Sequence, residues 1–448
     1  MMLGKIRCEA ILKEVLQLSR EAGETEVSVF TSEGGLTRFA ENYIHQNAVE
    51  RNAQASVRVI FGRQIGHAGT NRVDTEGLRS MVERAVAIAR LSEENPDFGG
   101  LPSDSEAIPL VDAFRPSTER YSPQRRAEAI AKLIFAAKEK GFRASGAFGT
   151  GLREFAIANS KGISRYQSAT VADFNTVVMS DDSSGYANAS ALDVCDLDVD
   201  SLAKEAVDKA ERSRHPIDLP AGEYPVVLEE YAVSDLVGFL AYLGFNGMTY
   251  REGQSFLTEK KGQKVAVPEI SIWDDGLDTR GLAQPFDFEG VPKRRVDLVK
   301  NGIAGEPVWD SYNSRLANVT NTGHALPAPN TYGPIPLNVF MAPGLTPKAD
   351  LLKGVERGIW VTRFHYVNPL HPKKTLLTGM TRDGTFLIEN GRITKGIKNM
   401  RFTASILDAL SKVEAIGSTT RCFISTFGSS CVPALRIGSF AFSGVTRF

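Results

Sequence analysis

The sequence predicts an α+β protein, in which two mixed α/β domains precede a β-rich C-terminal domain. Its 448 residues are enough for two or three domains with a large buried core. Amphipathic helices alternate with short β-rich runs in the first half, whereas the second half has one clear helix and many strands. Segments rich in proline and glycine separate these regions. They place the domains at residues 1–115, 116–220 and 221–448.

The N-terminal domain is predicted to contain two helices that flank a meander of strands. Apolar residues recur on one helical face at 11–18 and again at 78–89, and Gly23 ends the first helix. Strands separated by glycine-containing turns are expected at 27–30, 36–40, 49–51 and 56–61. Residues 95–116 are rich in proline, glycine, serine and aspartate, which predicts a linker.

The middle domain is predicted to begin at Ser122 and Pro123, a favourable N-cap followed by proline at the first helical position. This helix should run to Lys140, with Gly141 as its cap. A second helix is expected at 202–212. Short strands are expected at 144–148, 153–159, 163–170 and 175–180. Three prolines within 215–225 mark the next boundary.

The C-terminal domain is predicted to be mostly β-structure around a single helix at 229–244, which follows a strand at 226–228. Residues 381–384, Thr-Arg-Asp-Gly, have the composition of a turn, and Asn390-Gly391 that of a tight hairpin. Further strands are expected at 265–272, 295–300, 339–342, 360–366, 385–388 and 435–442.

The charge and the cysteine count exclude several classes of protein. Lys and Arg number 52 and Asp and Glu number 53, so a net charge of -1 provides no basic surface for nucleic acid. Four cysteines in a long chain argue against a disulfide scaffold and indicate a reducing compartment. The first residues lack the apolar run of a signal peptide, and no stretch reaches the roughly 20 apolar residues of a membrane helix. We therefore expect a soluble cytoplasmic protein without nucleic-acid or membrane partners.

Residues 376–391, LLTGMTRDGTFLIENG, resemble the C-terminal domain of the TldD/TldE family, in which TldE is also called PmbA. These are metal-dependent peptidases once named modulators of DNA gyrase. Four more segments resemble the family in the same order: 37–47 (TRFAENYIHQN), 158–162 (ANSKG), 398–417 (KNMRFTASILDALSKVEAIG) and 431–437 (CVPALRI). The resemblance covers the chain from Thr37 onward and implies a C-terminal domain of the TldD/PmbA type.

By this resemblance, catalytic members carry His-Glu-x-x-x-His on the helix after the first strand of that domain. The histidines bind zinc, the glutamate is the general base, and a cysteine in the C-terminal loop completes the site. Here Gly238, Phe239 and Leu243 occupy the three motif positions, and the cysteine position falls near Ser425. Gly238, Phe239 and Leu243 can neither bind zinc nor accept a proton. The chain therefore resembles TldE, with no catalytic or metal-binding residue of its own and with zinc expected on a TldD-like partner.

Two histidines are candidate contacts for the substrate. His45 lies in the family-like segment 37–47, and His324 lies on a loop that would face a substrate channel. A purely structural role, at a strand end for His45, is the alternative for each.

The sequence gives less support to other metal sites, to nucleophilic catalysis or to nucleotide binding. His365 and His371 are spaced too irregularly for a structural zinc site, and Cys422 and Cys431 are expected as free cysteines in the core of a closing β-hairpin. No nucleophile elbow, P-loop or dinucleotide fingerprint occurs in the sequence. A peptidase with a displaced metal site at these histidines or a cysteine is a third, weaker reading.

The leading hypothesis is a TldE/PmbA-like, non-catalytic subunit of a TldD/TldE-type metallopeptidase that acts on unfolded peptides. By resemblance, the two chains form a dimer that encloses a cavity, and strand edges in its wall can pair with a peptide backbone. The alternative is a stand-alone homodimer that binds peptides or regulates without hydrolysis. The two hypotheses differ in whether a TldD-like partner is required.

Overall fold

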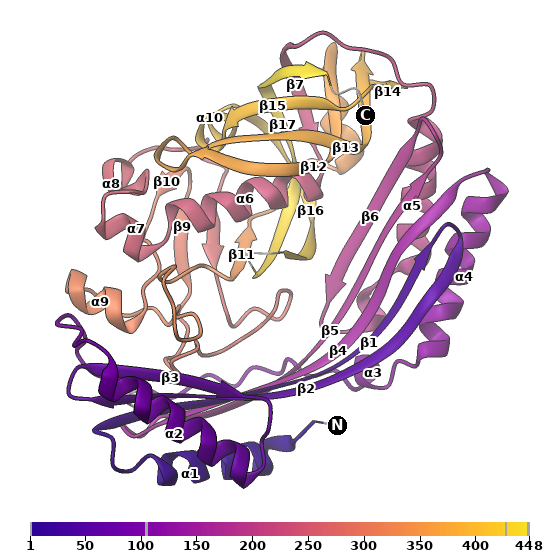
Figure 1. Cartoon of the computed structure of the whole chain (residues 1–448). Helices are drawn as coiled ribbons and strands as arrows, with labels where there is room; N and C mark the ends of the chain where they lie inside the picture. Colours follow the sequence, from indigo (N-terminus) through magenta and orange to yellow (C-terminus); the bar gives the residue numbers. More distant parts are fainter. Residues whose placement is uncertain (1, 104–105, 426–427, 446–448) are drawn as a thin grey trace.

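The protein contains two β-sheets with surrounding helices, in a computed structural model that describes residues 2–103, 106–425 and 428–445 (Figure 1). A six-stranded sheet has the order β3-β2-β1-β4-β5-β6. An 11-stranded sheet has the order β10-β9-β8-β11-β17-β15-β13-β12-β7, with β14 joined to β13 and β16 to β17. This arrangement confirms the predicted mixed α+β class and the β-rich C-terminal region.

The six-stranded sheet is antiparallel throughout and combines strands from the first two predicted domains. β1 pairs with β4 from Glu26–Asn159 to Phe39–Gly146 without a break. The strands are β1 (Glu24–Ala40), β2 (Tyr43–Phe61), β3 (Gln64–Thr70), β4 (Arg143–Asn159), β5 (Ser164–Met179) and β6 (Ser184–Ala191). The proposed boundary near residue 115 therefore separates two stretches of sequence that share one sheet.

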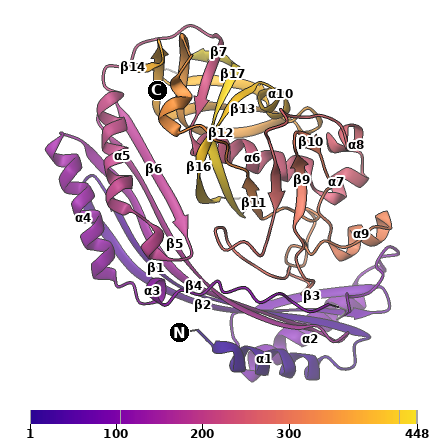
Figure 2. The ribbon, with the colours of Figure 1, turned by 180° about the vertical axis from the view of Figure 1, so that it is seen from behind.

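Helices cover only one face of this long, curved sheet, its outer face (Figures 1 and 2). At one end, α1 (Gly4–Leu18) and α2 (Thr75–Leu91) bury a core with β1 and β2. At the other end, α4 (Pro123–Glu139) and α5 (Val199–Arg212) bury a second core, and the short α3 (Pro116–Glu119) precedes α4. The opposite face, here called the inner face, is turned toward the C-terminal region.

The capping residues predicted for α4 are confirmed, whereas the first helix ends at Leu18 and not at Gly23. The Ser122 hydroxyl accepts a hydrogen bond from the backbone N–H of Arg125, which is the N-cap geometry, and Pro123 opens α4. Gly141 follows the helix with a φ of +74°, a conformation that glycine adopts at little cost.

The predicted division of this sheet into short strands is wrong. Gly34 and Gly35 lie inside β1, paired with Glu50 and Val49, instead of in a turn. In the same way, the four short strands predicted for the middle region are the two long strands β4 and β5. Glycine within a strand often marks a close approach of another group rather than a break.

The C-terminal region packs its core around α6 (Glu230–Gly244), which follows β7 (Gly222–Leu228). β7 lies between a parallel neighbour, β12 (Arg357–His371), and an antiparallel one, β17 (Gly428–Val445). The other elements are α7 (Gly247–Arg251), α8 (Leu257–Lys260), β8 (Ile272–Asp274), β9 (Val296–Lys300), β10 (Ile303–Ala304), α9 (Ser311–Ala317), β11 (Asn338–Met341), β13 (Leu376–Glu389), β14 (Arg392–Gly396), β15 (Met400–Ser405), α10 (Ile406–Ser411) and β16 (Val413–Ser425). Three short 3-10 helices lie at Val194–Asp196, Lys348–Leu352 and Pro372–Lys374.

Two local predictions in this region are corrected. The strand expected at 265–272 is only the short β8, which starts at Ile272. Residues 381–384 form no turn: they lie within β13, where Asp383 and Gly384 have φ of +54° and +114° beside a shift in the β12–β13 register. A β-bulge uses the same turn-forming residues. The hairpin at Asn390-Gly391 is confirmed by φ of +51° and +73°.

The two cysteines of the closing hairpin form a disulfide. Cys422 and Cys431 stand directly opposite each other on β16 and β17, with their Cα atoms 4.1 Å apart. The predicted hairpin is confirmed, but the expectation that these cysteines are free is wrong, because cross-strand partners lie within disulfide reach. The small number of cysteines therefore does not identify a reducing compartment. In the described residues, no helix has both the length and the hydropathy to cross a membrane.

Candidate functional site

Helix α6 is positioned by the core of the C-terminal region. Its apolar side chains Val233, Leu236, Val237, Leu240 and Leu243 form a continuous buried stripe. Gly238 is also buried, and Phe239 is half-buried. The three residues at the expected motif positions thus serve packing.

Zinc does not fit these residues, because each protein ligand atom must come from an imidazole, a carboxylate or a thiolate. Gly238 has no side chain, and Phe239 and Leu243 carry only carbon. Among the described residues there is no group of three or more His, Cys, Asp or Glu side chains that could hold a metal. The side chain of Ser425 lies outside what the structure describes.

A buried network of charges surrounds the start of α6. Glu229 is 1% exposed and accepts hydrogen bonds from Lys209 at 2.8 Å, Lys348 at 3.1 Å and the Trp360 indole at 2.6 Å. Burial alone raises the pKa of Glu229, but Lys209 and Lys348 outweigh it and hold the pKa below its usual range. The adjacent Glu230 pairs with Lys348 at 2.5 Å.

The same network connects α5 to the C-terminal sheet. Glu205 of α5 pairs with Lys209 at 2.7 Å and with Arg421 of β16 at 2.9 Å. The Tyr231 hydroxyl donates to Glu205 at 3.0 Å and also contacts Arg421. These contacts join α5, which packs on the six-stranded sheet, to β16 and to the start of α6.

A second polar cluster lies beside the middle of α6. Arg363 of β12 forms an ion pair with Asp383 of β13, and its guanidinium carbon lies 4.3 Å from the centre of the Tyr186 ring of β6. Asp235 of α6 faces this cation. Burial raises the pKa of Asp235 to about 7, and the attraction of Arg363 partly opposes that rise. Asp235 can therefore exchange a proton near neutral pH.

The inner face of the sheet is polar where β5 and β6 approach this cluster. Asp173 stands opposite Ser190, and Asn175 opposite Asn188. The Ser190 hydroxyl donates to Asp173 at 2.7 Å and accepts from the backbone N–H of Ile424 at 3.2 Å. Burial raises the pKa of Asp173. The amides of Asn175 and Asn188 can both donate and accept hydrogen bonds.

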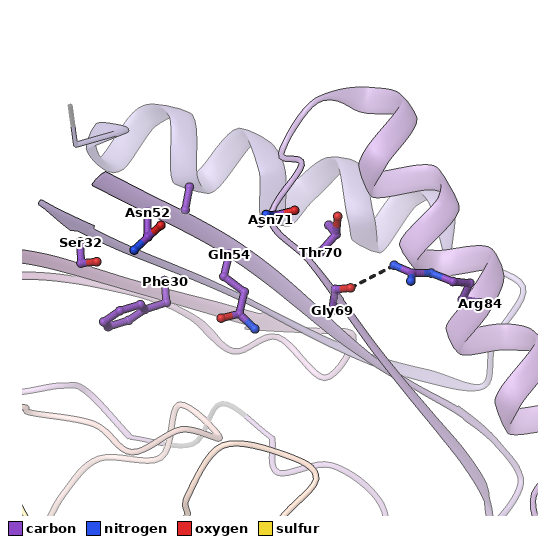
Figure 3. Close-up of a pocket in the computed structure, with 9 residues that line it drawn as sticks. Phe30, Ser32, Asn52, Gln54, Gly69, Thr70, Asn71 and Arg84 are labelled. Carbon is purple, nitrogen blue, oxygen red and sulfur yellow. Dashed lines mark hydrogen bonds between the residues drawn. The ribbon is translucent and has the colours of Figure 1, made fainter. Parts of the chain in front are cut away.

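Farther along the inner face, two rows of side chains cross four strands. One row is Gln54, Phe30, Phe155 and Gln167, and the next is Asn52, Ser32, Arg153 and Ala169. Figure 3 shows the first part of these rows, where Phe30, Ser32, Asn52 and Gln54 line a cavity of about 550 Å³. Arg84 of α2 closes its edge by donating to the Gly69 carbonyl at 3.0 Å. Such amides suit the polar groups of a peptide backbone.

His324 lies in the interior and not on an open loop. Its side chain is fully buried, with Nε2 at 2.8 Å from a carboxylate oxygen of Asp274 and Nδ1 at 3.0 Å from the Thr322 hydroxyl. Burial, together with the positive charge of Lys293, lowers the pKa of His324 more than Asp274 raises it. Because both ring nitrogens are occupied and no part of the ring is exposed, we propose a structural role in place of the predicted contact with substrate.

In contrast to the buried His324, His45 is exposed to solvent. It is the extra residue of a bulge in β2, between the pairs Arg38–Gln46 and Phe39–Ile44. A contact with substrate stays a prediction for His45. His365 and His371 both lie on β12, at positions opposite Met380 and Leu376.

Sequence analysis did not identify several polar residues around this face: Arg153 of β4, and Asp235 of α6 and Arg363 of β12 in the C-terminal region. The available signal was the alternation of polar residues along β4 to β6, as at Asp173 and Asn175. That alternation identifies a polar face, but only the folded sheet reveals that this face is opposite α6.

Comparison with known sequences gives one consistent family. Residues 25–89 match the model of the PmbA/TldA metallopeptidase domain 1, residues 116–214 that of the central domain, and residues 221–444 that of the C-terminal domain. The Metalloprotease PmbA of Escherichia coli is 24% identical over 97% of this chain and 96% of its own. The Metalloprotease TldD homolog of Haemophilus influenzae is 31% identical over 232 residues, 50% of this chain. The match spans about half (47%) of the length of that relative.

Solved structures share the fold over almost the whole chain. TldE from Thermococcus kodakarensis superposes with a TM-score of 0.87 and 21% identity, over 97% of this chain and 99% of that one. A putative modulator of DNA gyrase from Thermotoga maritima gives 0.86 and 19% identity, over 97% and 100%.

Proposed function

Because the chain belongs to the PmbA/TldD metallopeptidase family, we propose that it is a TldE/PmbA-like, non-catalytic subunit of a metallopeptidase complex that acts on unfolded peptides. The observation that carries this proposal is helix α6. Gly238, Phe239 and Leu243 stand where, by family resemblance, catalytic members carry their zinc ligands and general base, and all three take part in packing.

Zinc and the hydrolytic step are therefore assigned to a TldD-like partner. In this proposal, the present chain supplies part of the wall that receives the peptide. The amide-lined inner face supports that role, because Asn52, Gln54 and Gln167 offer donors and acceptors to a backbone without selecting a side-chain sequence. His45 remains a candidate contact at the far end of β2.

A peptidase assay with reconstituted mixtures tests the proposal. An unfolded peptide is incubated with this chain alone, with a TldD-like partner alone, and with both, each with and without a chelator. We expect cleavage in the mixture that the chelator abolishes, and none from this chain alone. The matched control is a mixture in which the motif glutamate of the partner is changed to glutamine, since removing the general base should stop turnover but leave assembly intact.

The other outcomes are equally informative. Cleavage by this chain alone that a chelator inhibits would refute the proposal and require a metal site outside α6. Peptide binding without cleavage in every mixture would instead favour a stand-alone homodimer that binds or regulates without hydrolysis.

A further inference from the structure

A second, smaller cavity of about 220 Å³ lies between the inner face of the sheet and the loops of the C-terminal region. Phe30, Arg153, Phe155 and Gln167 form its floor, as neighbours in the two rows that cross the sheet. Leu282 and Phe288 cover it from the C-terminal side. Phe30 also lines the larger amide-rich cavity, so the two cavities adjoin.

Arg153 is the single charged side chain among the described residues that line the smaller cavity. Crowding by its neighbours removes part of its hydration and lowers its pKa, and no carboxylate of the described residues offsets that effect. The next residue, Glu154, is directed to the outer face, where it binds Thr31 at 2.6 Å and Tyr166 at 2.7 Å. Arg153 retains contact with solvent, so its guanidinium is a cation that is available to a ligand.

The rest of the wall is largely apolar and aromatic. The ring of Phe155 lies 5.7 Å from that of Phe286 and 5.0 Å from that of Phe288, measured between centres. Phe30 keeps 40% of its surface exposed. An exposed aromatic side chain beside an unpaired cation suits a ligand with an apolar body and a negative end.

A guanidinium presents two parallel N–H groups that match the two oxygens of a carboxylate. The volume of the cavity is about that of one large amino-acid residue with its terminal group. The amide side chains of Asn52 and Gln54 line the adjoining cavity, which offers room for the residues that precede the last one of a peptide. We propose that the cavity binds the C-terminal carboxylate of a peptide whose last residue is apolar, with Arg153 as the anion-binding residue. This inference rests on the proposed function, because it assumes a peptide ligand.

Binding to this chain alone, measured by titration calorimetry, tests the inference without a partner or metal. The probes are N-acetyl-Ala-Ala-Phe with a free carboxylate, the same peptide as its C-terminal amide, and 3-phenylpropionate as a free apolar acid. We expect the acid peptide to bind about tenfold or more tightly than the amide, which is the effect of one charge-assisted hydrogen bond. We expect 3-phenylpropionate to bind more weakly than the acid peptide, since it lacks the preceding backbone.

Arg153→Gln should abolish the preference for acid over amide. The matched control is Arg143→Gln on the same strand, where the arginine already pairs with Asp181 at 3.1 Å, and it should keep the preference. Ala169→Leu places a larger side chain in the cavity and leaves Arg153 in place; it should weaken both peptides. Thermal unfolding of each variant verifies that it is folded.

Equal binding of acid and amide by the unchanged protein would overturn the inference, as would a preference that survives Arg153→Gln. If 3-phenylpropionate binds as tightly as the acid peptide, the site is one for small apolar acids and the peptide assignment is overturned. Failure of the peptidase mixtures would leave these binding results unaffected, so the two proposals fail separately.

Discussion

The folded structure shifts the pKa of Asp235, a residue of α6, far from its usual value. Burial raises its pKa to about 7, while Arg363 opposes the rise. Since an unfolded aspartate titrates near pH 4, the folded chain binds one proton more than the unfolded chain between about pH 4 and pH 7. The stability that this proton provides is complete below pH 4 and is lost as the pH rises through 7.

Asp235→Asn should therefore raise the free energy of unfolding at pH 8 by about 1 to 3 kcal/mol and change it little at pH 4, because the amide carries no charge at either pH. Chemical denaturation at both pH values measures this. Asp181→Asn, at a carboxylate whose side chain is 97% exposed, is the control and should have no effect at either pH. A stabilisation of equal size at pH 4 and pH 8 would show that charge is not the cause.

At this scale, residues within α6 could be assigned from the sequence, whereas the residues that surround the helix could not. Gly238, Phe239 and Leu243 could be placed because they follow a recognisable strand without a gap. The influence of Arg363 on Asp235 could not be predicted, because the two residues are far apart in sequence and only the packing of β12 on α6 brings their charges near each other. The burial of His324 was not predictable for the same reason, because only the folded chain brings its loop inward onto Asp274.

Among the elements, the packing of α4 on β1 depends on Gly35, which the sequence had placed in a turn. A Cβ atom at Gly35 would lie 2.6 Å from a guanidinium nitrogen of Arg126. Arg126 is 1% exposed and donates hydrogen bonds to Thr37 at 3.1 Å and Thr150 at 2.8 Å. The absence of a side chain at Gly35 lets α4 place this arginine against the sheet.

Gly35→Ala should lower the free energy of unfolding by about 1 to 3 kcal/mol, because the buried guanidinium must move and lose hydrogen bonds. The neighbouring Gly34 is a matched control, since a Cβ there meets nothing within 4 Å. Gly34→Ala should be neutral or slightly stabilising. Urea denaturation of both variants measures the difference, and equal destabilisation would contradict the role given to Arg126.

The long strands show why element boundaries were hard to predict. Turn-forming residues occur inside β1 and β13, where Gly35 accommodates a neighbour and Asp383-Gly384 forms a bulge. A local sequence window records the same residue types for a bulge, a close contact and a turn. Helix ends such as Ser122 and Gly141 were predictable because the capping interaction is itself local.

For the molecule as a whole, Glu229 connects the two sheets. Its carboxylate is shared by Lys209 of α5, which packs on the six-stranded sheet, and by Lys348 of the C-terminal region. Because the pKa of Glu229 lies below its usual range, its contribution to stability is present above pH 4.5 and is lost as the pH falls below that value.

Glu229→Gln should lower the free energy of unfolding at pH 7 by about 3 kcal/mol, since it leaves two partly buried ammonium groups without their shared anion. Chemical denaturation at pH 7 measures the loss. Asp200→Asn breaks the exposed pair between Asp200 and Lys132 of α4, and serves as the control with an expected effect below about 1 kcal/mol. Similar losses in the two variants would mean that Glu229 adds no more than a surface ion pair.

The uninterrupted pairing of β1 with β4 has a consequence for how such a chain can be divided. A fragment that ended in the segment near residue 110 would leave the edge of β1 open along its length, and the fragment beginning there would leave β4 equally open. Open edges of that length recruit other strands and promote aggregation. We therefore expect the first two sequence regions to fold and to be expressed as one unit, and we expect fragments that separate them to aggregate.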